Sequence, residues 1–211
     1  MKKFVAIAGN IGVGKSTLVE MMCAQWGWHP FVEGVVDNPY LADFYADMRA
    51  WAFHSQIYFL SQRLRDLRRL MAHEQAVVQD RTVYEDAEIF AKNLHRQQLI
   101  NARDWKSYSE LYQALTQLLP PPDLVVYLQA SVPTLLQRIA QRGRDYEKNI
   151  APDYLARLNE LYEEWIGGFQ LCPALIVPAD RLDFVSNRQH LELILQKIQD
   201  KLRGEQLVLF D

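Results

Sequence analysis

The sequence predicts a three-layer α/β protein in which a five-stranded parallel sheet carries helices on both faces. Two observations lead to this prediction. Short, continuous apolar runs, which are typical of buried parallel strands, alternate along the chain with longer segments that read as helices. A glycine-rich loop, Gly9–Ser16, also stands between the first predicted strand and the first predicted helix.

Five short segments are predicted to be the strands. The first, 4–8, is a continuous apolar run that stops at the glycine-rich loop. The second, 28–32, ends at Glu33, and the third, 76–79, ends at Asp80. The last two strands cover 124–128 and 174–177.

Eight longer segments are predicted to be helical. Proline opens three of them, which cover 39–48, 133–141 and 152–166. The run Pro120–Pro122 stops the helix over 107–119, because proline lacks the backbone N–H and clashes with the preceding turn. Gly143 interrupts the helix that begins at Pro133. The remaining helices cover 17–25, 50–75, 85–98 and 188–203.

Length and composition indicate one domain over residues 1–211 that binds neither nucleic acid nor membrane. A net charge of −3 gives no global basic field. No apolar run approaches the roughly 20 residues that cross a bilayer, and the first one is too short for a signal peptide, so a cytoplasmic location is expected. Cys23 and Cys172 lack the paired spacing of a zinc site or disulfide framework. The apolar tail, about 204–211, is expected either to be disordered or to pack on a partner subunit.

The loop Gly9–Ser16 fits the pattern G-x-x-x-x-G-K-[ST], which binds the phosphates of a nucleotide. A chance match in a chain of this length is roughly a 1% event. Glycines let backbone N–H groups face the phosphates, Lys15 would reach the β- and γ-phosphates, and Ser16 would bind Mg²⁺. The alternative is a glycine-rich turn with a surface lysine. The expected nucleotide contacts are Gly9, Asn10, Ile11, Gly12, Val13, Gly14, Lys15, Ser16 and Thr17.

Acidic residues stand at the carboxyl ends of two predicted strands, where ligands bind in parallel α/β sheets. Glu33 could act as a base on a substrate hydroxyl, or it could be a capping or solvated glutamate. Asp80 is placed as the Mg²⁺-associated acid of phosphate-loop proteins. Arg81, beside it, could hold Glu33 and stabilise charge on the transferring phosphoryl group.

Two helices carry polar pairs at helical spacing. Gln56 and Arg63 lie seven residues apart, so both fall on one face at a separation of about 10 Å. Asp86 and Phe90 share a face four residues apart. These residues either line a binding site or belong to exposed faces and, for Phe90, to the core.

A basic segment follows the fourth strand. Arg138 and Arg142 share a helix face at i, i+4, where like charges repel unless an anion lies between them. Gly143 lets the segment bend, as a closing lid must. Arg144 and Glu147 complete the segment, for which the alternative is a solvated basic helix end.

These clusters, in this order from Lys3 to about Phe184, resemble the deoxyribonucleoside kinase family of the deoxycytidine, deoxyguanosine and deoxyadenosine kinase type, as found in bacteria. The resemblance implies the P-loop kinase fold with an arginine-rich lid formed by Arg138, Arg142 and Arg144. It also places Asp183 and Phe184, by a weak two-residue match, in a loop against the adenine of the donor. This chain departs from the family in having Gly34 where proline is usual, and aspartate at position 80 where glutamate is frequent.

The resemblance implies a role for each acceptor-side residue. Glu33, Arg81 and Lys15 are the implied catalytic residues, with Glu33 as the base for the sugar 5′-hydroxyl, and Ser16 and Asp80 are associated with Mg²⁺. Tyr45 and Glu147 match contacts to the 3′-hydroxyl, Gln56 the reader of the base, and Phe90 the ring that stacks on it. The implied nucleoside-binding residues are Glu33, Tyr45, Gln56, Arg63, Arg81, Asp86, Phe90 and Glu147.

The expected activity is the transfer of the γ-phosphoryl group of ATP to the 5′-hydroxyl of a deoxyribonucleoside. Arg63 and Asp86 match members that act on deoxycytidine, deoxyadenosine or deoxyguanosine and not the thymidine-preferring ones, and a purine is favoured by analogy. A homodimer is also implied, through a helix pair such as those beginning at Ala50 and Glu85. Two alternatives stay open, which are a thymidylate-type nucleoside monophosphate kinase and a non-catalytic, nucleotide-dependent regulator.

Overall fold

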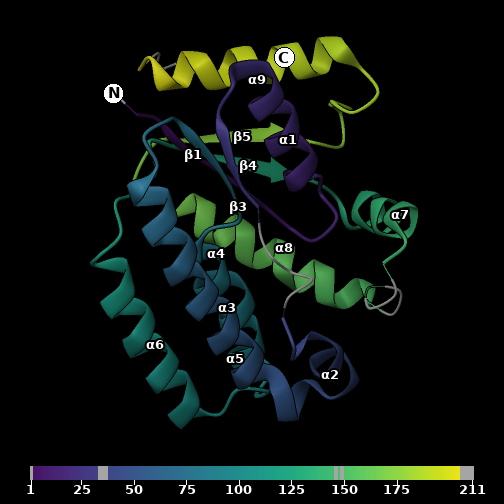
Figure 1. Ribbon diagram of the computed structural model, residues 1–211. Helices are drawn as coiled ribbons and strands as arrows, with labels where there is room; N and C mark the ends of the chain where they lie inside the picture. The colour runs from purple at the N-terminus through teal and green to yellow at the C-terminus, as the bar shows by residue number, and fades with distance from the viewer. Residues whose placement is uncertain (1, 33–37, 145–146, 148–149, 205–211) are drawn as a thin grey trace.

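The predicted parallel sheet is confirmed by a computed structural model, which describes residues 2–32, 38–144, 147 and 150–204. Five parallel strands are arranged in the order β2-β3-β1-β4-β5 (Figure 1). Their bounds are Phe4–Gly9 (β1), His29–Phe31 (β2), Val77–Asp80 (β3), Leu124–Gln129 (β4) and Ala174–Pro178 (β5).

Helices cover both faces of the sheet, as predicted (Figure 1). Helices α1 and α9 lie on one face, and α8 with the segment from α4 to α5 lies beneath the other. Helices α3 and α6 lie further out on that second side, and α2 and α7 flank the carboxyl edge of the sheet. The bounds are Lys15–Trp26 (α1), Leu41–Ala46 (α2), Met48–Ala72 (α3), Val83–Glu85 (α4), Lys92–Arg96 (α5), Ala102–Thr116 (α6), Val132–Arg142 (α7), Pro152–Gly167 (α8) and Arg188–Leu202 (α9).

The central strands explain why the apolar runs are continuous. Val5 to Gly9 of β1 and Leu124 to Leu128 of β4 are buried at every position, because each strand has neighbours on both sides and helices on both faces. The carboxyl ends of β1, β3 and β4 therefore meet at one edge. The segments that follow these strands are brought together there.

The predicted helix over 85–98 is interrupted. Between α4 and α5 the chain forms a π-helical segment, η2, over Asp86–Ala91. A π-helix is wider than an α-helix by one residue per turn and often marks a functional site. The i, i+4 pattern that predicted one continuous helix contains no signal for this change.

Much of the helix that was predicted to begin near Glu85 is buried within the chain. Ile89, Ala91 and Leu94 are fully enclosed, with α3 on one side and α8 on the other. Its outer side carries the charged residues Glu88, Lys92 and Arg96, and its part in a dimer stays a prediction. The outer neighbour of α3 is α6 (Figure 1).

Among the residues that the structure describes, no helix combines the length and apolar character needed to cross a membrane.

Candidate active site

A cavity of about 860 Å³ opens at the carboxyl edge of the sheet. The glycine-rich loop and the start of α1 line one part of it, and α2, α3 and η2 line another. Residues of α7, the segment after it and the loop over 179–186 complete the wall. Both halves of the site predicted from the sequence therefore face one space.

The glycine-rich loop wraps around the side chain of Lys15. The Nζ atom of Lys15 donates to the carbonyl oxygens of Gly9 at 2.9 Å and Asn10 at 3.1 Å, and the side chain is buried. Gly9 has a φ of 146°, and a Cβ atom there would lie 2.7 Å from the carbonyl oxygen of Leu128. Only glycine fits at this position, because both its conformation and its space exclude a side chain.

The loop over 179–186 packs directly on the glycine-rich loop. The ring of Phe184 is buried, and its Cζ atom would lie 3.1 Å from a Cβ atom on Gly14. Asp183 accepts hydrogen bonds from the backbone N–H groups of Val185 and Ser186, and these bonds, led by that of Ser186, lower the pKa of its carboxyl group. Both predicted donor-side residues therefore line the cavity beside the phosphate loop.

Asp80 and Ser16 meet at the floor of the cavity. The hydroxyl of Ser16 donates to Oδ2 of Asp80 at 2.5 Å. The other carboxylate oxygen, Oδ1, is buried and has no hydrogen-bond partner among the described residues. A hydroxyl beside an unsatisfied carboxylate oxygen suits a hard cation such as Mg²⁺.

Arg81 has an unusual backbone conformation at the end of β3. Its φ is 62°, in the left-handed region that non-glycine residues rarely adopt. Its guanidinium carbon lies 4.2 Å from the centroid of the Phe90 ring, so the two form a cation–π contact. Phe90 is half-buried, packs against the core and also lines the cavity, so its stacking on a base stays a prediction.

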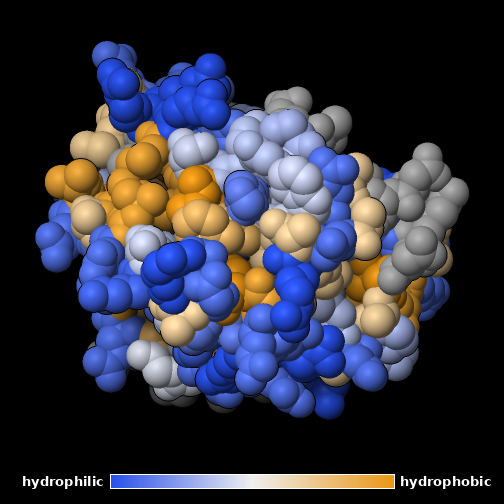
Figure 2. All heavy atoms as spheres, turned by 90° about the horizontal axis from the view of Figure 1, so that it is seen from below, coloured by the Kyte–Doolittle hydropathy of each residue, from blue (hydrophilic) through white to orange (hydrophobic). Residues whose placement is uncertain are grey.

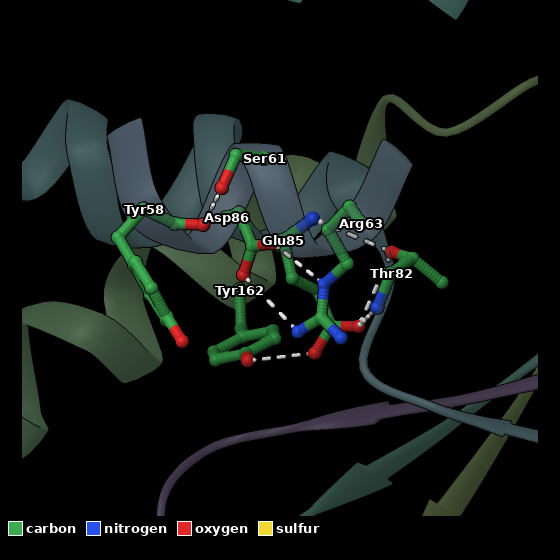
Figure 3. Close-up of polar contacts among 7 residues, drawn as sticks. All are labelled: Tyr58, Ser61, Arg63, Thr82, Glu85, Asp86 and Tyr162. Atoms are coloured by element: carbon green, nitrogen blue, oxygen red, sulfur yellow. Dashed lines mark hydrogen bonds and ion pairs between the residues drawn. The ribbon is translucent and has the colours of Figure 1, made fainter. Parts of the chain in front are cut away.

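Arg63 and Asp86 form a buried ion pair between α3 and η2 (Figure 3). Nε of Arg63 donates to Oδ2 of Asp86 at 2.7 Å, and Nη2 lies 3.5 Å from Oδ1. The interpretation of these residues as exposed helix faces is wrong, because their side chains are 5% and 4% exposed. Asp86 lines the cavity, and Arg63 lies behind it.

Gln56 and Tyr45 lie on the same side of the cavity. Gln56 is buried, and its Oε1 atom has no hydrogen-bond partner among the described residues. A buried amide oxygen that faces a cavity without a partner is a candidate to bind a polar ligand.

The arginines after β4 already have protein partners. Arg138 donates to the carbonyl oxygens of Val13 at 2.7 Å and Ala179 at 2.8 Å. Arg142 donates to Glu147, and Arg144 lies 3.6 Å from the same carboxylate. The premise that these charges need an anion between them is therefore wrong, since carbonyl oxygens and one glutamate satisfy them. All four side chains nevertheless line the cavity.

Glu33, the predicted base, lies outside the described residues, as do Gly34 and the tail from 205 to 211.

Sequence reasoning missed several residues that shape the site. Glu85 and Tyr162 lie beneath the phosphate loop, and the hydroxyl of Tyr162 lies 2.8 Å from Oε1 of Glu85. The spacing of Thr82 and Glu85 is that of a capping box, which the structure confirms, so the sequence did contain a signal for Glu85. Tyr154 lines the cavity, and burial raises the pKa of its hydroxyl to about 12. No local pattern marks either tyrosine.

The chain matches the model of the deoxynucleoside kinase family over residues 5–203. It belongs to the deoxynucleoside kinase family.

Curated relatives and solved structures agree with this assignment. The kinase is 36% identical to a deoxyadenosine/deoxycytidine kinase of Bacillus subtilis over 204 residues, which cover 96% of this chain and 94% of the relative. It is 36% identical to a deoxyguanosine kinase of the same organism over 205 residues, covering 93% and 96%. A structure of deoxyadenosine kinase from M. mycoides with the products dCMP and a flexible dCDP superposes with a TM-score of 0.84 at 33% identity, covering 93% of this chain and 99% of that one.

Membership in this family decides between the alternatives that the sequence left open. The kinase is a phosphotransferase with a deoxynucleoside as acceptor, and neither a nucleoside monophosphate kinase nor a non-catalytic regulator. A cavity that carries a phosphate loop at one side and buried polar groups at the other is consistent with that activity.

Proposed function

We propose that the kinase transfers the γ-phosphoryl group of ATP to the 5′-hydroxyl of a purine deoxyribonucleoside, with deoxycytidine as a further substrate. The observation that carries this proposal is the cavity that the phosphate loop and Asp86, which is held from behind by Arg63, line together. A donor and an acceptor bound at these two places are held for direct transfer. Phosphoryl transfer depends mostly on such positioning and on the stabilisation of charge.

On the donor side, the backbone of Gly9–Thr17 cradles the phosphates, and Lys15 exchanges carbonyl oxygens for phosphate oxygens. Arg138, Arg142 and Arg144 act as a lid. Their present partners are backbone carbonyl oxygens and Glu147, so phosphate binding requires an exchange of partners. Charge-assisted bonds to phosphate are strong enough to favour that exchange. Asp183 and Phe184 lie where they can flank the adenine.

Mg²⁺ bound with ATP would be held by Ser16 and Asp80 together with phosphate oxygens. The unsatisfied, buried Oδ1 of Asp80 supports this assignment. Within the described ranges, no three His, Cys, Asp or Glu side chains gather as a metal cage, which suits a cation that arrives with its nucleotide. The ion would neutralise charge on the phosphates.

On the acceptor side, Glu33 removes the proton from the 5′-hydroxyl as the bond to phosphorus forms. Arg81 stabilises the charge on the transferring group, and its fixed backbone conformation supports this role. Tyr45 and Glu147 bind the 3′-hydroxyl. Glu147 is held by Arg142 and Arg144, so the lid and the sugar site are coupled through one carboxylate.

The base is read by Gln56, Phe90 and Asp86. An aspartate that is ion-paired with arginine accepts hydrogen bonds and does not donate them. Adenine, guanine and cytosine each carry an exocyclic amino group that such an acceptor can bind, whereas thymine has none. Thymine would cover the Asp86 carboxylate without donating an amino hydrogen bond to it, so the pair disfavours thymine. The named substrates of the bacterial relatives support the purine preference.

Replacement of Glu33, the proposed catalytic base, tests the proposed direction of transfer. Glu33→Gln keeps the size of the side chain and removes its ability to accept a proton. We expect kcat for the formation of dAMP from deoxyadenosine and ATP to fall at least about 100-fold, with the Kd of deoxyadenosine within about threefold. Turnover near that of the wild type would remove Glu33 from the mechanism. Formation of a diphosphate from dAMP by the wild type, and none from deoxyadenosine, would contradict the proposal itself.

Replacement of the ion pair tests the origin of base selection. The double variant Arg63→Met and Asp86→Ala removes both charges together, so that neither is left buried alone. We expect the ratio of kcat/KM for thymidine to that for deoxyadenosine to rise at least about tenfold. Asp86→Ala alone is expected to be less stable than the double variant, as measured by thermal unfolding. An unchanged ranking of substrates would show that the pair is only structural.

We also propose that the kinase forms a homodimer through α3 and α6 and acts in the cytoplasm, where its proposed substrates meet. Figure 2 shows apolar side chains gathered on the left part of the face seen from below, the side on which α6 lies in Figure 1. Met71, Leu111 and Leu118 are 57%, 40% and 69% exposed. Apolar patches of this kind are typical of interaction surfaces.

Charged substitutions test this surface by sedimentation. Leu111→Lys with Leu118→Lys is expected to convert a particle of twice the chain mass into one of the chain mass, because two lysines would be desolvated in the interface. Leu171→Lys is the matched control, since Leu171 is 56% exposed and lies in the segment between α8 and β5. A dimer that survives the double substitution would place the interface elsewhere.

A further inference from the structure

Glu85 is a fully buried carboxylate next to the phosphate loop, and Figure 3 shows its contacts with Thr82 and Tyr162. Its Oε1 atom accepts from the backbone N–H of Gly9 at 3.1 Å, and its Oε2 atom from that of Thr82 at 2.9 Å. The hydroxyls of Tyr162 and Thr82 lie 2.8 Å and 3.2 Å from Oε1 and Oε2. Each oxygen therefore faces one backbone N–H group and one hydroxyl.

On one side, Glu85 fixes the first peptide of the phosphate loop. The N–H of Gly9 is held by Glu85, and the carbonyl oxygen of Gly9 is held by Lys15. The hydroxyl of Tyr162 lies 2.8 Å from both that carbonyl oxygen and the carboxylate. The chain on both sides of Gly9 is therefore held in place before any nucleotide binds.

On the other side, Glu85 fixes the turn that carries Arg81. The N–H of Arg81 donates to the carbonyl oxygen of Ile7 at 3.1 Å, and the next N–H, that of Thr82, donates to Glu85. These two bonds hold the backbone at Arg81 and at the next residue, and so they fix the left-handed conformation of Arg81. A conformation of this kind persists only where its surroundings determine it.

Two positively charged side chains of the site, those of Arg81 and Lys15, affect the pKa of Glu85. Burial raises the pKa of its carboxyl group, and Arg81 and Lys15 act in the opposite direction. Arg81 and Lys15, which are proposed to handle phosphoryl charge, thus favour the ionised form of this carboxylate together with the N–H groups of Thr82 and Gly9.

We infer that Glu85 is a positioning residue for phosphoryl transfer, which sets the phosphate loop and the Arg81 turn in one geometry by bridging Gly9 and Thr82. This inference rests on the transfer proposed above. Glu85 lies below the loop and does not line the cavity, so it acts through Gly9, Lys15 and Arg81.

The bridge requires a carboxylate and not only a side chain of that size. In Glu85→Gln, one of the two terminal atoms becomes an NH₂ group. Whichever way the amide turns, that group faces the N–H of Gly9 or of Thr82, donor against donor. One half of the bridge is then lost.

Glu85→Gln is expected to lower kcat with deoxyadenosine and ATP about 100-fold, because small misplacements of catalytic groups have effects of this size. The Kd of deoxyadenosine should stay within about threefold. Glu88→Gln is the matched control, because Glu88 lies on the same segment, is partly exposed and pairs with Lys92 at 3.5 Å. It should leave kcat unchanged. A folded Glu85→Gln protein with kcat within twofold of the wild type would overturn the inference.

A double-mutant cycle separates positioning from general stability. Arg81→Lys is expected to lower kcat by itself, and the effect of Glu85→Gln should shrink at least about threefold in its presence, since one of the groups that Glu85 positions is already altered. Fully additive effects would overturn the inference. The wild type tests the proposed function separately. If the wild type does not phosphorylate deoxyadenosine, the proposed function is wrong. If the wild type and the Glu85→Gln protein are equally active, only the positioning role is wrong.

If Glu85→Gln does not fold, Tyr162→Phe replaces it. This variant removes one hydroxyl and keeps both backbone N–H groups bonded to Glu85. We expect a decrease in kcat of about threefold to tenfold with an unchanged Kd for deoxyadenosine. An unchanged kcat would contradict the role of the Glu85 and Tyr162 pair.

Discussion

The structure depends on a single constraint, the confinement of Gly9 at the end of the central strand. The residue has no space for a side chain, and its N–H and carbonyl groups are held by Glu85, Lys15 and Tyr162. Because β3 and β4 flank β1, the segments that follow β3 and β4 start at fixed positions relative to Gly9. Asp80 and Arg81 follow from the end of β3, and α7 with its arginines follows from the end of β4.

The two halves of the cavity differ in how their polar groups are satisfied. On the side proposed to read the base, Arg63 and Asp86 are paired and Gln56 is buried with an unsatisfied oxygen. On the side proposed to bind the donor, Arg138 and Arg142 are bonded to carbonyl oxygens and to Glu147. Under the proposed function, specificity is built into rigid helices, and the charges that stabilise transfer are recruited when the phosphates arrive.

Much of this could be predicted from the sequence, because the signals were local. Strand runs, the phosphate loop and the capping proline and glycine residues each have a chemical pattern over a few residues, and every predicted strand was found. The π-helical turn at Asp86 has no such pattern. Whether Arg63 was exposed could not be decided either, because its burial depends on the packing of α6 and η2 against α3. Tyr162, which meets the loop across 153 residues of sequence, was invisible for the same reason.

The central claim is that one cavity joins a phosphate loop to an ion pair that selects the base. The most direct test is kcat/KM of the wild type for the four deoxynucleosides with ATP and Mg²⁺. The account predicts the highest values for deoxyadenosine and deoxyguanosine, a lower but measurable value for deoxycytidine, and a value for thymidine at least about 100-fold below the best substrate. A value for thymidine equal to or above that of the purine deoxynucleosides would contradict it.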